Sequence, residues 1–273
     1  MLKDIEHLLR RERLPHIWCP GCGNGIVMKA MLEAIFESGL DPEKTVVVSG
    51  IGCSSRASGY LNFDTVHTTH GRALTFATGI KLAKPELNVF VVTGDGDGTA
   101  IGGNHFIHAC RRNIDLNIVL FNNNIYGMTG GQYSPLTPQG RFATTSPYGN
   151  LERSFDICEL AKSAGATYVG RGTVFHTKLL KDLLKSAVAN KGLSLVEAVS
   201  ICPISYGRKN KLGDAPQMMK WLRDNTVMAK AAEKMEPEKI KDKIIIGELN
   251  NETAPEYTAL YDQLIARFQK GAE

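Results

Sequence analysis

The sequence predicts an α/β fold in which a parallel sheet is covered by helices on both faces. Short apolar runs of strand length alternate along the chain with longer segments whose apolar residues recur at helical spacing. The chain has 273 residues, of which 43% are hydrophobic, so it is long enough to bury a large core. No internal repeat or low-complexity tract interrupts the alternation.

The elements are predicted in order from the N-terminal side. The first helix, near 24–38, has an apolar stripe that begins at Ile26 and ends at Ile35. The next helix, near 72–84, repeats this spacing from Leu74 to Leu82. The other predicted helices lie near 103–113, 156–164 and 176–190, and the predicted strands lie near 45–49, 89–93, 117–121 and 193–199.

Two changes in composition divide the chain. Residues 134–150 are rich in Pro, Ser, Thr and Gly, which predicts a long loop that reaches toward a partner subunit. From residue 207 the chain becomes charged, and we expect a helix from Gln217 to Glu236 followed by a short tail. The domain prediction is therefore 1–206 for the main domain and 207–273 for a helical extension that packs on the core or on a partner.

Charge and hydropathy exclude several classes of protein. The net charge of +4 is small and no basic run is interleaved with aromatic residues, so a nucleic-acid partner is not expected. The charged N-terminal segment does not resemble a secretory signal, and no apolar stretch approaches the ~20 residues of a membrane span. We therefore expect a cytoplasmic protein that does not contact a membrane.

The segment GDGDG (residues 94–98) and the later NNNIY (122–126) carry the strongest functional signal. Each follows an apolar run, so Asp95 and Asn123 are expected at the carboxyl ends of two parallel strands, where open α/β sheets bind ligands. A carboxylate, a carboxamide and a nearby carbonyl suit Mg²⁺, and glycines let the backbone approach a diphosphate. The pattern resembles the thiamine-diphosphate fingerprint, with Asp95, Asn123 and the carbonyl of Ile125 as the metal ligands.

Three other interpretations fit the GDG segment less well. A dinucleotide-binding GxGxxG is excluded because Ile101 stands where the third glycine belongs. An EF-hand loop fails because Thr99 and Ala100 replace the expected ligand and glycine. A glycine-rich turn between a buried strand and a helix is the remaining alternative, and the spacing to Asn123 argues against it.

The six cysteines are not expected to form disulfides in a cytoplasmic chain. Cys19 and Cys22 form a CxxC, which is compatible with a redox dithiol, half a zinc site or half an Fe–S site. Cys53 and Cys202 each follow a strand-like run, and four thiolates on such loops suit a [4Fe–4S] cluster. The other two, Cys110 and Cys158, fall in helical patterns and are expected to be buried free cysteines.

Taken in order, WCPGCG, GIGCSSR, HTTHGR, GDGDG with NNNIYGMTGGQ, and a late Cys-Pro resemble the β subunit of the 2-oxoacid:ferredoxin oxidoreductases, most closely the 2-oxoglutarate branch. The resemblance runs from about Trp18 to about Lys211. It implies a thiamine-diphosphate-binding fold with Mg²⁺ and one [4Fe–4S] cluster. The implied cluster ligands are Cys19, Cys22, Cys53 and Cys202, of which Cys202 is matched only by its place after a strand and before a proline.

The resemblance also implies the reaction and the partners. A 2-oxo acid, 2-oxoglutarate in this branch, and coenzyme A give an acyl-CoA (here succinyl-CoA) and CO₂, and electrons pass through the cluster to ferredoxin. Thiamine activation needs a glutamate from another domain, and the chain shows no second thiamine-binding half. In the resembling family an α subunit supplies it, so a heterodimer or a dimer of heterodimers is expected.

The remaining site residues lie on loops. His70 is expected against the cofactor, on its diphosphate or on the substrate, with a capping or surface histidine as the alternative and a His67/His70 zinc pair as a remote one. Arg56 is a candidate for a substrate carboxylate or, alternatively, an ordinary surface arginine. His105 and His108 are interpreted as packing or capping residues. The residues expected to contact the cofactor are Ile51, Gly52, Ser54, His70, Gly96, Asp97, Gly127, Met128, Thr129 and Gly130.

Three alternatives concern the function itself. The same chemistry on pyruvate or on branched-chain 2-oxo acids would leave the motifs unchanged. A non-oxidative thiamine-dependent decarboxylase or synthase would have no cluster and would leave the cysteine set unused. A non-catalytic Fe–S electron-transfer or scaffold subunit would instead lack bound thiamine.

Overall fold

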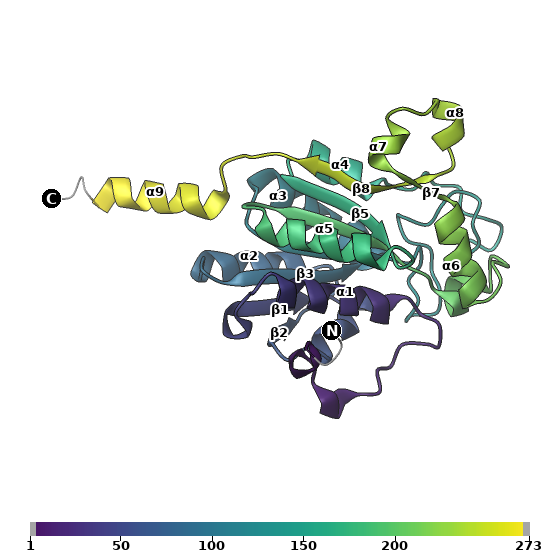
Figure 1. Ribbon diagram of the computed structural model, residues 1–273, viewed down its shortest axis with the longest axis horizontal. Coiled ribbons are helices and arrows are strands. Elements are labelled where there is room, and N and C mark those ends of the chain that lie inside the picture. Colours follow the sequence, from purple (N-terminus) through teal and green to yellow (C-terminus); the bar gives the residue numbers. More distant parts are fainter. Residues whose placement is uncertain (1–3, 270–273) are drawn as a thin grey trace.

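A single sheet organises the molecule (Figure 1). The computed structural model describes residues 4–269, and within them eight strands follow the order β2-β1-β3-β4-β6-β5-β8-β7. All neighbouring strands are parallel except β5 and β8, which pair antiparallel. The strands are β1 Thr45–Ser49, β2 Asp64–His67, β3 Asn88–Gly94, β4 Asn117–Asn122, β5 Tyr168–Thr173, β6 Ser194–Val199, β7 Thr226–Met228 and β8 Ile244–Asn251.

Helices cover both faces of this sheet, as the sequence predicts. The described helices are α1 Asn24–Glu37, α2 Ala73–Ala83, α3 Gly103–Arg112, α4 Ile157–Ser163, α5 Thr177–Ala189, α6 Ala215–Asp224, α7 Ala229–Ala232, α8 Pro237–Ile240 and α9 Tyr257–Gln269. Single helical turns also follow three strands directly, at Ser54–Gly59, Asp97–Ile101 and Pro203–Gly207. These turns stand at the carboxyl edge of the sheet, where its parallel strands end.

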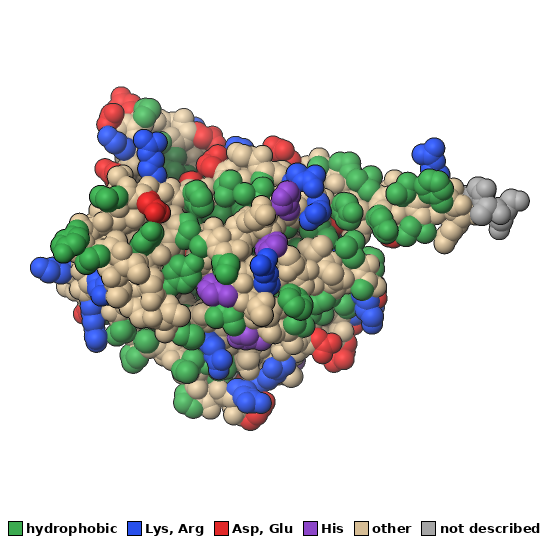
Figure 2. All heavy atoms as spheres, turned by 180° about the vertical axis from the view of Figure 1, so that it is seen from behind, with side chains coloured by type: hydrophobic (Ala, Val, Ile, Leu, Met, Phe, Trp, Pro, Cys, Tyr) green, Lys and Arg blue, Asp and Glu red, His purple; other side chains and the backbone are tan. Residues whose placement is uncertain are grey.

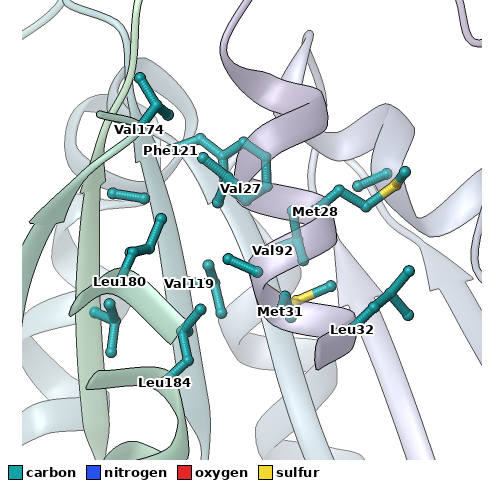
Figure 3. Packing of buried hydrophobic residues seen from close by; sticks show 14 of the residues in the cluster. Val27, Met28, Met31, Leu32, Val92, Val119, Phe121, Val174, Leu180 and Leu184 are labelled. Atoms are coloured by element: carbon teal, nitrogen blue, oxygen red, sulfur yellow. The ribbon is translucent and has the colours of Figure 1, made fainter. Parts of the chain in front are cut away.

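The core consists of two layers, one on each face of the sheet. Successive strand residues point to opposite faces, so Val47 joins one layer while its neighbours Val46 and Val48 join the other. On the first face α1 and α5 pack side by side, and Figure 3 shows Val27 and Met31 of α1 facing the strands beside Leu180 and Leu184 of α5. The first turn of α1 is thereby held at the carboxyl edge of the sheet.

The opposite face is covered by α2, α3 and α4, whose buried side chains form the second layer. The outer surfaces of α2 and α3 keep several large apolar side chains exposed, among them Phe76, Leu82 and Ile107. Figure 2 shows the molecule from behind, with apolar side chains beside histidine and basic ones. His105 is half-buried and contacts Arg72, whereas His108 is exposed, so neither belongs to the core.

Within residues 1–206, the predicted elements agree with the structure to within one or two residues at their ends. Four strands of the sheet were not predicted: β2 and β5 in the main domain, and β7 and β8 in the extension. The edge strand β2 has no apolar run, and β5 reads YVGRGT, which looks like a turn because it contains two glycines. In the fold, Gly170 and Gly172 face α5, and a Cβ on either residue would lie 3.1 Å from a leucine side chain of that helix. These glycines let α5 lie close against the sheet.

The expectation of one helix from Gln217 to Glu236 is wrong. The segment is divided into α6, the short strand β7 and α7, because the helix ends at Asn225 and the chain turns into the sheet. The extension is also not purely helical, since β8 pairs with β5 inside the main sheet. The boundary at 206/207 stays a prediction.

The last described helix, α9, projects away from the body in both full views (Figures 1 and 2). Its apolar side chains, from Leu260 to Phe268, are exposed, and among its described residues only Thr258 is buried. Between residues 4 and 269, no helix is both long enough and apolar enough to cross a bilayer.

Candidate active site

A cavity opens at the carboxyl edge of the sheet, at the ends of β3 and β4. Loops that are distant in sequence meet there, and we refer to it as the strand-edge cavity. Nearly all residues predicted to contact the cofactor or Mg²⁺ line it, except Gly130. Its described lining consists of Ile51, Gly52, Cys53, Ser54, His70, Gly94, Asp95, Gly96, Asp97, Phe121, Asn123, Ile125, Tyr126, Gly127, Met128 and Thr129.

Asp95 is a buried carboxylate at this edge. Its side chain accepts a hydrogen bond of 2.5 Å from the hydroxyl of Ser134, and only 3% of the residue is exposed. Burial raises the pKa of Asp95 from 3.8 to about 7, although hydrogen bonds from Ser134 and from the backbone of Gly96 and Ile125 favour the charged form. A cation bound here would compensate that charge.

Asn123 and Ile125 lie beside Asp95, at the end of β4. The side-chain oxygen of Asn123 accepts a hydrogen bond from the Ile125 amide at 3.3 Å, which forms a tight turn. Asn124, between them, has a φ of 61°, a left-handed conformation that asparagine tolerates. Asn123 and Ile125, joined by this turn, line the strand-edge cavity together with Asp95, so the three predicted Mg²⁺ ligands lie at one site.

Gly96 is required by a close approach of Tyr126. A Cβ at residue 96 would lie 2.2 Å from the tyrosine ring, and the Tyr126 hydroxyl donates to the Gly96 carbonyl at 2.8 Å. Burial raises the pKa of Tyr126 to about 12, so the hydroxyl keeps its proton. The ring therefore locks the GDG turn against the 122–131 loop.

Asp97 connects three loops of the site. Its Oδ1 accepts from the amides of Ile51 (3.1 Å) and Gly71 (2.8 Å), and its Oδ2 accepts from the Thr93 hydroxyl (2.7 Å). His70 Nδ1 lies 2.6 Å from the same Oδ1. Protein donors therefore occupy the Asp97 carboxylate. Only the backbone of this residue is left to face a diphosphate.

Four of the six cysteines meet beside the strand-edge cavity. The Trp18 indole donates to the Cys53 carbonyl at 2.6 Å, which joins the CxxC loop to the loop after β1. The Gly23 amide donates to the Ile201 carbonyl at 3.2 Å, which joins the same loop to the one after β6. A Cβ on Gly127 would lie 3.5 Å from Sγ of Cys53 and 3.8 Å from Sγ of Cys202.

The four thiols also influence one another electrostatically. Burial raises the pKa of Cys22 to about 12, and the neighbouring thiols of Cys202, Cys53 and Cys19 add to this effect. Burial likewise raises the pKa of Cys53 to about 11, with contributions from Cys202 and Cys19. The neutral thiol is thus favoured at Cys22 and Cys53, and bound iron would be needed to hold these two as thiolates.

The donor set fits a cluster better than it fits a single ion. Within residues 4–269, no three His, Cys, Asp or Glu side chains are arranged to hold one metal ion. A [4Fe–4S] cluster does not need such convergence, because each of its irons takes one thiolate and the sulfurs stay apart. Four thiols on adjoining loops, with glycine at 127 between two of them, meet that requirement.

The remaining predicted residues lie elsewhere. Arg56 is exposed on the turn that follows Cys53, outside the described lining of the cavity, and Gly130 adjoins the lining at Thr129. Cys110 and Cys158 are buried and free, as predicted. Cys158 lies under the sheet and donates to Glu197 at 3.3 Å.

Ser134 is the main functional residue that the sequence did not reveal. The long loop 134–150 was expected to reach a partner, yet its first residue folds back onto Asp95. The Thr137 hydroxyl binds the Asn124 carbonyl at 2.7 Å and holds the loop there. The sequence shows that hydroxyl residues cluster in this loop. It does not show that one of them, Ser134, contacts Asp95.

Comparison with known proteins agrees with this geometry. The family described as "Thiamine pyrophosphate enzyme, C-terminal TPP binding domain" matches residues 50–198. The 2-oxoglutarate synthase subunit KorB of Methanothermobacter marburgensis is 53% identical over 91% of this chain and 87% of its own length. The 2-oxoacid:ferredoxin oxidoreductase subunit beta of Saccharolobus solfataricus is 47% identical over 68% of this chain and 62% of its own. A solved 2-oxoglutarate:ferredoxin oxidoreductase from Magnetococcus marinus, with 2-oxoglutarate, coenzyme A and succinyl-CoA bound, superimposes with a TM-score of 0.88 at 33% identity, over 97% of this chain and 91% of that one.

Proposed function

This chain belongs to the 2-oxoacid:ferredoxin oxidoreductases as a β-type subunit, and from that premise we propose the role it has in the complex. It binds Mg²⁺-thiamine diphosphate and one [4Fe–4S] cluster. Together with an α subunit it converts 2-oxoglutarate and coenzyme A to succinyl-CoA and CO₂, and electrons pass to ferredoxin. The observation that carries the proposal is that the strand-edge cavity and the four-cysteine cluster share one wall, at Cys53 and Gly127.

The Mg²⁺-diphosphate end of the cofactor is assigned to the turn at 94–97 and the end of β4. Asp95, Asn123 and the carbonyl of Ile125 would supply three oxygen ligands, and Mg²⁺ keeps other positions for phosphate oxygens and water. The buried carboxylate with a raised pKa supports this assignment, because a divalent cation would favour its charged form.

The cluster is assigned to Cys19, Cys22, Cys53 and Cys202. Thiamine diphosphate supplies an electron sink for decarboxylation, and a nearby cluster supplies a one-electron acceptor. The contribution of the chain is to place the two sites side by side: Cys53 lines the strand-edge cavity and its sulfur faces Gly127, which lines the same cavity. A non-oxidative thiamine enzyme would have no use for this arrangement.

A partner subunit is needed to complete the site. Among the described residues that line the strand-edge cavity, none is a glutamate, although thiamine activation uses one. We assign that glutamate to the α subunit, as the resemblance implies. The isolated chain should therefore bind the cofactor without turning over substrate.

The preference for 2-oxoglutarate rests on the relatives and on Arg56. Arg56 is exposed on the turn that follows Cys53 and does not line the cavity, so the proposal requires its side chain to reach the substrate from outside that lining. A bidentate hydrogen-bonded pair with the distal carboxylate would distinguish 2-oxoglutarate from pyruvate.

The test is anaerobic co-purification with the α subunit, followed by ferredoxin or viologen reduction with a panel of 2-oxo acids. We expect a brown complex that requires coenzyme A and prefers 2-oxoglutarate. Arg56→Met should lower kcat/KM for 2-oxoglutarate about tenfold to a hundredfold more than for pyruvate. An equal loss for both acids would assign Arg56 to the shared carboxylate. A colourless complex that decarboxylates without reducing ferredoxin would overturn the oxidative assignment.

A further inference from the structure

Asp97 is a buried carboxylate of the site, and protein groups bind both of its oxygens. It is 3% exposed, and its two oxygens accept hydrogen bonds from Ile51, Gly71 and Thr93. A Cβ at Gly50 would lie 1.9 Å from Oδ2, so the turn after β1 presses directly on the carboxylate. No Lys or Arg side chain within the described part of the chain pairs with it.

His70 is the one ionisable partner of this carboxylate among the described residues. Its Nδ1 is buried and lies 2.6 Å from Oδ1 of Asp97, at ion-pair distance, although the contact does not have the geometry of a hydrogen bond and Nδ1 makes none elsewhere among the described residues. The ring stands edge-on to Tyr126, with 5.9 Å between the ring centroids and an interplanar angle of 61°. One third of the side chain is exposed, and His70 lines the strand-edge cavity. With Nδ1 turned to Asp97, Nε2 lies on the opposite side of the ring.

We propose that Asp97 is a positioning residue, which fixes the His70 imidazole with Nδ1–H on its carboxylate and presents Nε2 to the cofactor cavity. A carboxylate at one ring nitrogen sets the tautomer and the orientation of a histidine, and thereby the role of the other nitrogen. The proposal rests on the proposed function, in that the ligand at Nε2 is the diphosphate of thiamine.

The negative charge of the side chain explains why residue 97 has to be an aspartate and not a neutral acceptor. An anion at Nε2 and a carboxylate at Nδ1 both favour a ring that donates from both nitrogens. The chain Asp97–His70–phosphate would then place a positive group between two negative ones. An asparagine at 97 keeps the length and one oxygen of the side chain but removes the charge.

A double-mutant cycle tests the proposal. The readout is cofactor binding to the complex that is co-purified with the α subunit. Affinity for Mg²⁺-thiamine diphosphate is measured by calorimetry for the wild type, Asp97→Asn, His70→Ala and the double variant. Each single change should weaken binding about tenfold to a hundredfold, and the double variant should be no weaker than the worse single one. Losses that multiply in the double variant would show that the two residues act independently and would overturn the proposal.

Thr93→Val serves as the matched control. It removes the hydrogen bond to the other oxygen of Asp97 without touching the contact with His70. We expect it to lower the melting temperature while changing cofactor affinity less than about threefold. If Thr93→Val weakened binding as much as Asp97→Asn, Asp97 would only hold the loops together.

A second readout does not depend on the cofactor. In the full chain labelled with ¹⁵N-histidine, long-range ¹H–¹⁵N spectra report which nitrogen of His70 carries the proton, and His70→Ala assigns the signal. The wild type should show an Nδ1–H form that Asp97→Asn loses. A wild-type ring that carries its proton on Nε2 and none on Nδ1 would overturn the proposal even if the cofactor binds. If the wild type bound no thiamine diphosphate but kept the Nδ1–H form, the proposed function would fail and the pairing would stand.

Discussion

Asp95 shows at the scale of one residue how a binding site lowers the stability of the fold that carries it. The carboxylate is buried, and burial raises its pKa to about 7. Because the folded chain holds this proton more tightly than the unfolded chain, the destabilisation is absent at low pH. It develops between about pH 4 and pH 7 and is complete above that range.

Asp95→Asn should therefore stabilise the cofactor-free chain. At about pH 8 we expect the free energy of unfolding to rise by about 2–4 kcal/mol, whereas at about pH 4 the two proteins should be equal. The same variant should lose the increase in melting temperature that Mg²⁺ and thiamine diphosphate give the wild type. Denaturant unfolding at both pH values measures the first effect. An Asn variant that is less stable at high pH would show that the carboxylate is compensated within the protein.

The cysteines make a second prediction at this scale. Serine replacements at the four clustered positions should each lower the iron and sulfide content per chain, whereas replacements at the two buried positions should not. The physical reason is that only the clustered thiols face one another across the loops. A full cluster in the Cys202 variant, with a loss in the Cys158 variant, would show that the fourth ligand is misassigned. The six variants are Cys19→Ser, Cys22→Ser, Cys53→Ser, Cys202→Ser, Cys110→Ser and Cys158→Ser.

The elements show how far the sequence could predict this fold and why it stopped. Strands with uniformly apolar residues, such as β1 and β3, were located correctly, because strands covered on both faces have this composition. The strand β5 was missed, because its glycines serve helix packing rather than a turn. At the site, Asp95 and Asn123 follow apolar strands and were predicted, whereas Ser134 approaches Asp95 through a loop that has no periodicity.

The close packing of α5 on β5 can be tested directly. Gly172→Val would place methyl groups against Leu180, whose Cα lies 3.2 Å from a Cβ at this position. Because backbone and side-chain atoms both stand in the way, we expect a loss of about 1–3 kcal/mol in the free energy of unfolding. Gly79→Ala is the control with the opposite sign. Its Cβ would meet nothing within 4 Å on the exposed side of α2, so helix propensity should stabilise the chain by about 0.5–1 kcal/mol. A neutral Gly172→Val would mean that α5 can move away from the sheet at little cost.

At the scale of the whole molecule, α9 and β8 contribute to stability in opposite ways although both lie in the same extension. The described part of α9 buries only Thr258, whereas β8 forms a ladder with β5 and packs Ile246 into the body. A chain truncated after Thr258 should therefore unfold within about 1 kcal/mol of the full chain. A chain truncated after Lys243 should not fold cooperatively. Denaturant titration by circular dichroism distinguishes the two. A large loss on removing residues 259–273 would show that α9 packs on a surface in solution.

The place of β8 also has a consequence for how this protein is made. On the ribosome, β5 emerges well before the strand that covers its open side, because residues 174–243 are synthesised between β5 and β8. At about 5–20 residues per second, the wait lasts on the order of ten seconds. During that time the nascent sheet carries an unpaired edge, a ready template for another chain. Translation is therefore the period in which this subunit is most exposed to aggregation, and slow codons between β6 and β8 would lengthen it.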